Sequence, residues 1–372
     1  MTTFSDLGVS EASIKALNEN NIFEPTEIQE KTIPFLLKSS IDLIAQAQTG
    51  TGKTAAFGLP LIQKVDADNP SVQALILCPT RELGQQIAKQ IFRFARYTPK
   101  RIYVEAVYGG AYIGDQIKAL KRPTQILVAT PGRLIDLLEK KAVELSHVKT
   151  IVLDEADEML SMGFKKELDS ILSQTQGKRN TWLFSATMPA SIQAIIKSYM
   201  LPDATRVQID KNNIVNKNID HKYVISEAKD KLDNLIQFLK IQGANRGLIF
   251  CVTKASAQTL AKQLFARNIP AEAIHGDLLQ KDRDKVMRAF KKERVQILIA
   301  TDLAARGLDV ENLSYVVHYE IPDQVEYYTH RSGRTARAGK KGMSISLITS
   351  KELKNLQEIA STLKIDIKEY NL

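Results

Sequence analysis

Short apolar runs alternate with longer amphipathic segments along the whole chain, and this alternation constrains the fold more than any other feature of the sequence. The runs of the first half include "ALILCPT", "QILVATP" and "TIVLDEAD", and those of the second half include "RGLIFCVT", "QILIATD" and "SYVVHYE". Between them, apolar residues recur at helical spacing, as in 83–94 and 255–265. Buried strands that alternate with amphipathic helices predict an α/β fold in which helices flank a mostly parallel sheet.

The two halves of the chain also resemble each other. The segment "LILCPT" from Leu75 matches "LIFCVT" from Leu248, and "ILVAT" from Ile126 matches "ILIAT" from Ile297 at nearly the same separation. Strand-rich segments can match by chance, but two matches at nearly one offset predict two similar α/β lobes in tandem. A polar, asparagine-rich stretch without periodicity lies between them. We therefore expect an N-terminal lobe at 1–208, a linker at 209–220 and a C-terminal lobe at 221–372.

Composition and charge narrow the class of protein. The net charge of +9 favours a polyanionic partner such as nucleic acid, although a basic enzyme with a solvated surface would show the same balance. The sequence has neither a signal-peptide pattern at its start nor an apolar run long enough to span a membrane, so no membrane partner is expected. Cys78 and Cys251 lie inside apolar runs, which favours buried thiols of a reducing compartment over a disulfide framework or a zinc site. We expect a cytoplasmic protein.

The segment "AQTGTGKT" fits the phosphate-loop pattern G-x-x-x-x-G-K-[ST], with Ala47 in the first glycine position. Gly50 and Gly52 would allow backbone N–H groups to converge on phosphate oxygens. Lys53 would reach the β- and γ-phosphates, and the Thr54 hydroxyl would bind Mg²⁺. The segment follows a strand-like run and precedes a plausible helix, which is the context that the motif requires. A turn that only resembles a phosphate loop is the alternative.

An acidic pair at the end of another apolar run would complete a nucleotide site. In "TIVLDEAD", Asp154 ends the run and Glu155 follows it. Asp154 can hold Mg²⁺, directly or through water, and Glu155 can orient or deprotonate the attacking water. Carboxylates at a helix N-terminus would be the ordinary explanation of this pair alone. The phosphate loop upstream favours the catalytic interpretation.

These segments belong to a longer series of motifs. "EPTEIQ", "AQTGTGKT", "PTREL", "TPGR", "DEAD", "SAT", "TDLAARGLD" and "HRSGRTAR" occur along the chain in that order. In this series the chain resembles the DEAD-box ATP-dependent RNA helicases over nearly its whole length. The resemblance implies two RecA-like lobes, ATP and Mg²⁺ as cofactors, and RNA as the partner. It also implies RNA-stimulated ATP hydrolysis that separates short duplexes or remodels RNA–protein complexes.

The resemblance assigns nucleotide-binding roles to a set of residues. Gln29 would pair with the adenine edge and select ATP over GTP, with support from Phe4, which would also serve as a hydrophobic staple before the first helix. Ile22 occupies the position of the aromatic that usually stacks on adenine, and Phe23 is one residue further on. The implied nucleotide-binding set is Phe4, Ile22, Gln29, Gln48, Thr49, Gly50, Thr51, Gly52, Lys53, Thr54 and Asp309.

The resemblance also implies an RNA-binding set made of small, hydroxyl-bearing and basic residues. Such residues suit phosphate contacts, so binding should be largely independent of base sequence and sensitive to salt. For Arg283, a solvated helical charge is the alternative. The implied RNA contacts are Arg81, Gly109, Gly110, Thr130, Gly132, Arg133, Gly276, Arg283 and Thr301.

The last motif, "HRSGRTAR", places arginines at a regular spacing, and these need an anion opposite them. Arg334 and Arg337 are expected to reach the γ-phosphate when the lobes close, which gives a catalytic set of Lys53, Asp154, Glu155, Arg334 and Arg337. A direct grip on RNA is the alternative. Ser332 and Ala336 replace the isoleucine and glycine that are usual in this motif. Residues expected to couple the lobes are Asp157, Ser185, Thr187, His330 and Arg331.

Two other functions fit the same motifs. One is a DNA-directed translocase of the same superfamily, and the other is an ATP-dependent RNA clamp without productive unwinding. No extension follows the second lobe, so target choice would come from partners such as ribosomal or RNA-decay assemblies, or the chain is the core of a longer protein.

Overall fold

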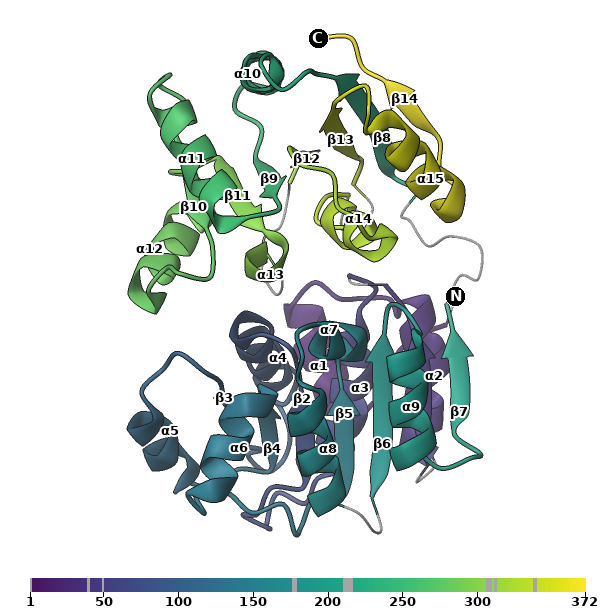
Figure 1. Ribbon diagram of the computed structural model, residues 1–372. Helices are drawn as coiled ribbons and strands as arrows, with labels where there is room; N and C mark the ends of the chain where they lie inside the picture. Colours follow the sequence, from purple (N-terminus) through teal and green to yellow (C-terminus); the bar gives the residue numbers. More distant parts are fainter. Residues whose placement is uncertain are drawn as a thin grey trace. The chain divides into compact units, whose positions relative to one another are not determined.

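The computed structural model describes residues 2–38, 41–48, 50–175, 179–209, 217–305, 310, 313–336 and 340–372. The chain divides into two compact units, Met1–Asp210 and Lys211–Leu372 (Figure 1). Each unit is built on a sheet of seven strands, and all the strand pairs are parallel. The predicted α/β fold with two tandem lobes is therefore confirmed.

The sheet of the N-terminal lobe has the strand order β3-β4-β2-β5-β6-β1-β7. Its strands are β1 (Leu43–Gln46), β2 (Ala74–Leu77), β3 (Val104–Val107), β4 (Ile126–Ala129), β5 (Thr150–Leu153), β6 (Asn180–Ser185) and β7 (Thr205–Gln208). The helices between them are α1 (Glu11–Glu19), α2 (Glu27–Lys38), α3 (Lys53–Lys64), α4 (Arg81–Phe94), α5 (Ile113–Leu120), α6 (Pro131–Glu139), α7 (Ala156–Ser161), α8 (Lys165–Gln174) and α9 (Ala190–Tyr199).

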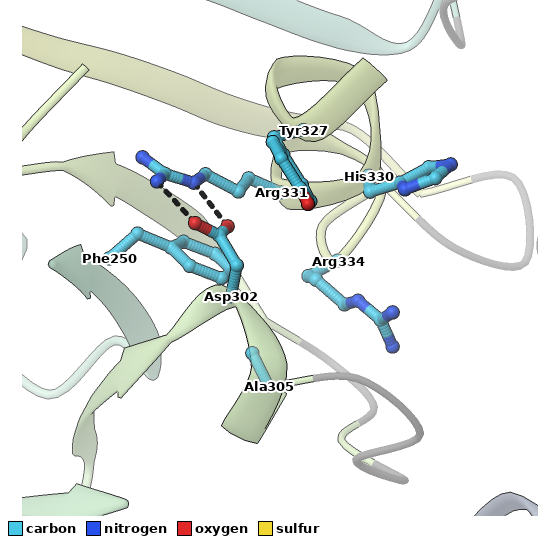
Figure 2. Close-up of a pocket in the computed structure, with 7 residues that line it drawn as sticks. All are labelled: Phe250, Asp302, Ala305, Tyr327, His330, Arg331 and Arg334. Carbon is cyan, nitrogen blue, oxygen red and sulfur yellow. Dashed lines mark hydrogen bonds and ion pairs between the residues drawn. The ribbon is translucent and has the colours of Figure 1, made fainter. Parts of the chain in front are cut away.

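The sheet of the C-terminal lobe has the order β10-β11-β9-β12-β13-β8-β14. Its strands are β8 (Ile219–Ile225), β9 (Gly247–Cys251), β10 (Ala271–Ile274), β11 (Ile297–Thr301), β12 (Tyr315–His318), β13 (Gly342–Ile348) and β14 (Ile367–Glu369). Its helices are α10 (Lys231–Gln242), α11 (Lys254–Phe265), α12 (Gln280–Lys291), α13 (Asp302–Ala305), α14 (Val325–Ser332) and α15 (Leu353–Leu363). Figure 2 shows that α13 and α14 approach each other where Arg331 binds Asp302.

The two strand orders are the same when the strands are compared position by position. The matched segments from Leu75 and Leu248 fall on β2 and β9, and those from Ile126 and Ile297 begin β4 and β11. β2 pairs with β4 and β9 pairs with β11, so the sequence repeat reflects equivalent positions in two sheets. The helices predicted at 83–94 and 255–265 are α4 and α11.

Adjacent residues of a strand point to opposite faces of the sheet. Helices cover both faces of a parallel sheet, so the side chains on both faces are buried. In β2 of the N-terminal lobe, Ile76 packs in one apolar cluster and Leu75 in another. The first cluster takes residues from α1 to α4, such as Phe57, and the second takes residues from α6 to α9, such as Met159. This arrangement leaves the carboxyl ends of the strands as the edge at which polar loops gather.

Both cysteines are free and buried, as predicted, with Cys78 just after β2 and Cys251 at the end of β9. Within the described ranges, no helix has the length and apolar character needed to cross a membrane.

A buried histidine makes the C-terminal lobe sensitive to acid. The Nδ1 atom of His221 lies 2.9 Å from the Tyr328 hydroxyl, and burial lowers the pKa of His221 to about 4 from an ordinary value of 6.5. The unfolded chain therefore binds this proton more readily than the folded lobe. Neutral His221 therefore contributes to the free energy of unfolding above pH 6.5, and this contribution is lost as the pH falls toward 4.

We expect His221→Asn to reduce the acid sensitivity of the C-terminal lobe, because an asparagine amide reaches the Nδ1 position but does not titrate in this range. Between pH 7 and pH 4, the free energy of unfolding of the wild-type lobe should fall by on the order of 3 kcal/mol more than that of the variant. Urea unfolding followed by circular dichroism at several pH values measures this difference. Trp182, the chain's single tryptophan, is buried in the N-terminal lobe, so its fluorescence provides a lobe-specific control that the substitution should not alter.

Candidate functional site

The predicted phosphate loop connects β1 to the start of α3. Gly50 and Gly52 have φ values of 83° and 91°, the left-handed region that glycine adopts without strain. Within the loop, the Thr51 hydroxyl donates a hydrogen bond to the Gln48 carbonyl at 2.8 Å. Lys53 is the first residue of α3 and is buried. A glycine-rich turn that leads from a parallel strand into a helix suits phosphate binding. Thr49 lies outside the described residues.

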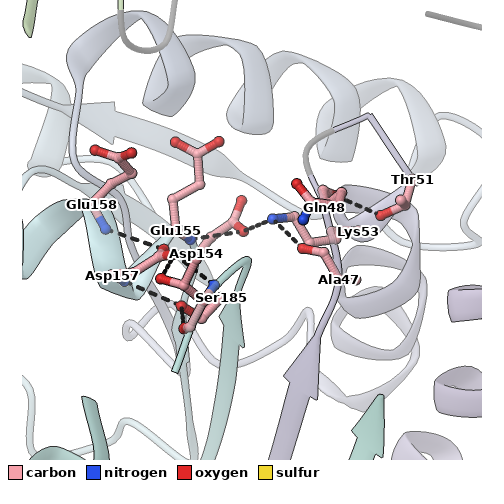
Figure 3. Close-up of polar contacts among 10 residues, drawn as sticks. Ala47, Gln48, Thr51, Lys53, Asp154, Glu155, Asp157, Glu158 and Ser185 are labelled. Carbon is pink, nitrogen blue, oxygen red and sulfur yellow. Dashed lines mark hydrogen bonds and ion pairs between the residues drawn. The ribbon is translucent and has the colours of Figure 1, made fainter. Parts of the chain in front are cut away.

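Lys53 and the acidic motif meet at the carboxyl edge of the N-terminal sheet (Figure 3). The Lys53 Nζ atom lies 3.9 Å from Asp154 Oδ1 and donates a hydrogen bond to the Ala47 carbonyl at 3.3 Å. Asp154 follows β5, and the phosphate loop follows β1, with β6 between these two strands. The parallel topology thus brings together two motifs that are about 100 residues apart, as phosphate-loop NTPases require.

The electrostatics around Asp154 favour a cation. The pKa of Asp154 is raised to about 6, chiefly by burial and also by the negative charges of Glu155 and Asp157, while the positive charge of Lys53 opposes the rise. A divalent cation would relieve this repulsion. The described residues contain no group of three histidine, cysteine or acidic side chains able to hold a metal alone. Mg²⁺ prefers a few protein oxygen ligands together with phosphate oxygens. The Asp154 carboxylate and the Thr54 hydroxyl therefore fit this ion.

Glu155 has a strained backbone. Its φ and ψ angles are 51° and 50°, so a glutamate occupies the left-handed region at the start of α7. Its side chain is buried beside Asp154. Non-glycine residues in this conformation cost free energy and concentrate at functional sites.

The acidic motif is bonded to the "SAT" segment after β6. Asp157 Oδ2 accepts hydrogen bonds from the backbone N–H and the hydroxyl of Thr187, both at 2.8 Å. The Ser185 hydroxyl accepts from the Asp157 N–H at 3.3 Å and donates to the Thr187 carbonyl at 2.7 Å. Three residues predicted to take part in coupling therefore form one network within the N-terminal lobe.

Gln29 contacts the phosphate loop, which the sequence did not predict. Its Nε2 donates to the Gly52 carbonyl at 2.9 Å, and its Oε1 accepts from the Thr26 N–H at 3.0 Å. The Thr26 hydroxyl donates to the Thr51 carbonyl at 2.8 Å. An amide has two donors and can accept twice, so Gln29 retains one donor and one acceptor site for a base.

The apolar residues assigned to the adenine site differ in exposure. Phe4 is buried in the core of the N-terminal lobe. It lies six residues before Ser10, the N-cap of α1, so it is not in the position of a hydrophobic staple. Ile22 is half-buried and packs against the same core. Phe23 is 64% exposed, so of these three side chains it is the one accessible for stacking.

We expect Gly52→Ala to lower ATP affinity by roughly tenfold or more, since the left-handed backbone costs an L-residue about 1–2 kcal/mol. The new methyl group would also lie 2.4 Å from Gln29 Nε2 and disturb its contact with the loop. Gly50→Ala is the matched control, because its φ is also positive but nothing lies within 4 Å of the added methyl group. Calorimetric ATP titrations should show the larger loss for Gly52→Ala, and equal losses would exclude a role for the Gln29 contact.

The RNA contacts predicted in the N-terminal lobe lie at the ends of the neighbouring strands β3, β4 and β2. Arg81 begins α4, Gly110 follows β3 with a φ of 81°, and Thr130 precedes α6. Arg133, in the first turn of α6, donates to the Ala111 carbonyl at 3.1 Å and so links the loops after β3 and β4. Gly109 lies beside Gly110 in the loop after β3, and Gly132 lies at the start of α6. A Cβ atom added to either glycine would have nothing within 4 Å. The predicted set is therefore contiguous along one edge of the sheet.

Tyr108 is an additional residue at this edge that the sequence did not predict. The Arg81 guanidinium lies 5.6 Å from its ring centroid, and its hydroxyl accepts a hydrogen bond from Gln85 at 2.6 Å. In the sequence, only its position immediately before Gly109–Gly110 indicates that Tyr108 lies beside the predicted RNA contacts.

The predicted contacts of the C-terminal lobe also lie near strand ends. Thr301 ends β11, at the position equivalent to Thr130, and Gly276 follows β10. Arg283 on α12 donates to the Ala304 carbonyl at 2.8 Å, which ties it to the segment after β11. Asp309 and Arg337, which were predicted to bind ATP and to act in catalysis, lie outside the described residues.

The last motif contains an ion pair within its own lobe. Arg331, 1% exposed, donates to both oxygens of Asp302 at 2.6 and 2.7 Å and to the Glu320 carbonyl at 2.6 Å. These bonds hold Arg331 within the C-terminal lobe. Asp302 follows Thr301 in "TDLAARGLD", but nothing in the spacing identifies it as the partner of Arg331.

Arg334 differs from Arg331 in its surroundings. It lines a small pocket together with Phe250, Asp302, Ala305, Tyr327, His330 and Arg331. Figure 2 shows its guanidinium directed away from the Asp302–Arg331 pair. Within the described part of the chain it has no ion-pair or hydrogen-bond partner for its side chain. This guanidinium is thus available to an anionic ligand.

Together, the phosphate loop, the acidic motif and the paired RecA-like lobes define an ATP hydrolase of the helicase type. The DEAD/DEAH box helicase model matches residues 26–195, and the helicase conserved C-terminal domain model matches residues 230–339. The chain belongs to the DEAD-box ATP-dependent RNA helicases. It binds RNA and hydrolyses ATP with RNA stimulation, as expected from the resemblance in its motifs.

Several proteins are similar over nearly the whole chain. The ATP-dependent RNA helicase CshA of Limosilactobacillus reuteri is 45% identical over 97% of this chain and 72% of the relative. The DEAD-box ATP-dependent RNA helicase CshA of Geobacillus kaustophilus is 44% identical over 98% of this chain and 77% of the relative. The structure of S. cerevisiae Dbp5 bound to RNA and ADP BeF3 matches with a TM-score of 0.91 and 30% identity, covering 100% of this chain and 96% of the other. Mss116p bound to ssRNA and AMP-PNP matches with a TM-score of 0.88 and 32% identity, covering 100% and 80%.

Proposed function

We propose that this helicase grips the RNA backbone without reading bases and uses ATP binding and hydrolysis to separate short duplexes or remodel RNA–protein complexes. The observation that supports the proposal is that the residues we assign to the nucleotide and to the RNA lie at the carboxyl ends of strands of one sheet. The phosphate loop and the acidic motif occupy the ends of β1 and β5, and the predicted RNA contacts occupy the ends of β3, β4 and β2.

In the nucleotide site, Lys53 would bind the β- and γ-phosphates, and Glu155 would orient the attacking water. Gln29 would read the adenine edge with its remaining donor and acceptor. Thr54 and Asp154 would hold Mg²⁺, which when bound supplies charge neutralisation for the phosphates. The raised pKa of Asp154 and its contact with Lys53 support this assignment.

In the RNA site, phosphates would bind to backbone N–H groups at the helix starts and at the glycine turns. The hydroxyls of Thr130 and Thr301 would bind phosphates as well. Arg81, Arg133 and Arg283 would add charge. Because these groups contact the backbone, affinity should fall with salt but vary little with sequence. Target choice would then depend on partners, for which ribosomal or RNA-decay assemblies are candidates, in the cytoplasm where both cysteines remain reduced.

Hydrolysis would depend on closure of the lobes about the linker between β7 and β8. Closure would carry Arg334 and Arg337 toward the γ-phosphate, where an arginine stabilises the charge of the transition state. The network of Asp157, Ser185 and Thr187, together with His330 on the other lobe, would transmit closure. The Arg334 guanidinium, which lines a pocket of its lobe and has no side-chain partner among the described residues, supports this role.

The test compares RNA and DNA of one sequence as stimulators of ATP hydrolysis, in parallel with a duplex-separation assay. We expect stimulation by RNA alone, duplex separation with ATP, and poor hydrolysis of GTP. Equal stimulation by DNA would favour a translocase. Slow dissociation from RNA without strand separation would favour a clamp, and efficient GTP hydrolysis would remove the proposed role of Gln29.

A further inference from the structure

A row of aromatic and polar side chains lies on the face of the C-terminal sheet that α14 covers. His318 on β12 is aligned with Phe250 on β9, and Ser344 on β13 is aligned with His221 on β8. Tyr328 of α14 stacks on His318, with ring centroids 4.5 Å apart and planes inclined by 8°. The rings of Phe250 and His221 continue the stack on either side, at 6.4 Å from His318 and 5.7 Å from Tyr328.

Three polar atoms within this row contact one another. The Ser332 hydroxyl lies 2.9 Å from the Ser344 hydroxyl and 3.4 Å from His318 Nε2, and His318 Nε2 lies 3.0 Å from the Ser344 hydroxyl. All three residues are fully buried. We call them the His318–Ser332–Ser344 cluster. Ser332 is the residue that stands where the family usually has isoleucine, so a polar site on the sheet matches a polar substitution on the helix.

The cluster fixes the geometry of the helix end because a buried polar group is costly when it loses its partners. Burial, together with the charges of Arg331 and His221, holds the pKa of His318 well below its ordinary value, so the ring is neutral near pH 7. A neutral imidazole can accept at one nitrogen and donate at the other. His318 Nδ1 has no hydrogen-bond partner among the described residues, so the Nε2 atom carries all of its bonding.

Ser332 is the last residue of α14, and Arg334 is two residues further along the chain. The Arg334 N–H donates to the Arg331 carbonyl at 3.1 Å, which continues the helical turn. Two anchors therefore hold this turn, the Arg331–Asp302 ion pair on one side and the cluster on the other. The guanidinium of Arg334 points away from the Arg331–Asp302 pair (Figure 2).

We propose that the His318–Ser332–Ser344 cluster positions the end of α14 and thereby sets the Arg334 guanidinium for ATP hydrolysis. His318 and Ser344 are positioning residues, since both are fully buried within the lobe and would act through the backbone of the last helical turn. The inference rests on the proposed role of Arg334.

The test uses variants that differ in which atom of His318 they replace. A glutamine amide reaches the position of Nε2 and can keep the bonds to both serines, whereas an asparagine amide reaches only the position of Nδ1, which has no described partner. His318→Gln is therefore the conservative variant and His318→Asn the disruptive one. Ser332→Ala removes the hydroxyl on the helix. Ser346→Ala is the matched control, because Ser346 is buried on the same face of β13 but bonds neither His318 nor Ser332 in the described contacts.

For each variant of the 372-residue chain, the measurements are kcat and KM of RNA-stimulated ATP hydrolysis, RNA affinity without ATP, and the unfolding temperature. We expect kcat to fall about tenfold in Ser332→Ala and His318→Asn, within the ~100-fold that misplacement of a reacting group can cost. The KM for ATP and the RNA affinity should be unchanged, and His318→Gln and Ser346→Ala should keep kcat within about twofold of the wild type. A loss of kcat that follows the unfolding temperature across all four variants would indicate a packing effect and overturn the proposal.

Arg334→Ala is measured in the same series. It distinguishes failure of the positioning inference from failure of the proposed role of Arg334. If Arg334→Ala abolishes turnover while Ser332→Ala and His318→Asn retain it, the positioning inference is wrong and the role of Arg334 stands. If Arg334→Ala retains turnover, the proposed role of Arg334 is wrong, and the inference fails with it. Where His318→Asn does not fold, Ser332→Ala against Ser346→Ala still decides the outcome.

Discussion

Replacing Glu155 with glutamine is expected to lower RNA-stimulated ATP turnover by about 10²- to 10⁴-fold, the contribution typical of a general base. The substitution removes the carboxylate that would orient the attacking water but preserves the size of the side chain. ATP affinity should change little, because Lys53 and Asp154 keep their contact at 3.9 Å. Because hydrolysis is blocked after ATP has bound, the variant should remain on RNA in the presence of ATP.

Single-turnover hydrolysis and RNA dissociation measure these two effects. Glu158→Gln is the matched control, since Glu158 is also buried and lies three residues further along the chain, immediately after the motif. It should leave turnover near the wild-type value. Near-normal hydrolysis by Glu155→Gln would show that water is positioned by another group.

Replacing Arg334 with alanine is expected to reduce turnover at saturating RNA by about 10³- to 10⁵-fold, the effect of arginines that stabilise the transferring phosphoryl group. Local structure leaves this guanidinium without a described partner, whereas Arg331 is neutralised by Asp302. Affinity for RNA without ATP should be preserved, because the arginine would act on the nucleotide.

The measurement is ATP hydrolysis as a function of RNA concentration, with binding of RNA followed separately. Arg288→Ala provides a control for the lost positive charge, since Arg288 is exposed on α12. If RNA affinity falls in Arg334→Ala and turnover recovers with added RNA, the arginine binds the RNA backbone.

Features encoded by short local patterns were predictable. The alternation of apolar runs and helical segments gave the parallel sheets, and the repeat from Leu75 and Leu248 identified equivalent strands. The phosphate loop could be predicted because glycine, lysine and threonine at this fixed spacing are typical of a loop that binds nucleotide phosphates. Asp154 could be placed beside Lys53 because parallel strands end at the same edge of a sheet.

Contacts between distant segments were not predictable from one sequence. Gln29 was expected to read a base, but its amide also bonds the Gly52 carbonyl, an interaction that depends on how α2 packs beside α3. Arg331 was assigned to lobe coupling, and its bond to Asp302 depends on the approach of α13 to α14. Ser332 was noted only as a departure from the usual motif. Its partners on β12 and β13 become apparent only when the sheet is formed.

The left-handed conformation of Glu155 has an evolutionary consequence. A glutamate at a φ of 51° costs the N-terminal lobe about 1–2 kcal/mol relative to an ordinary backbone, and glycine would recover part of this. Selection for stability alone would therefore replace Glu155, at the expense of the carboxylate that we assign to the attacking water. Stabilised variants obtained by screening for thermal resistance should accumulate glycine or asparagine at this position and lose hydrolysis, so the residue marks a point where stability and activity are in direct competition.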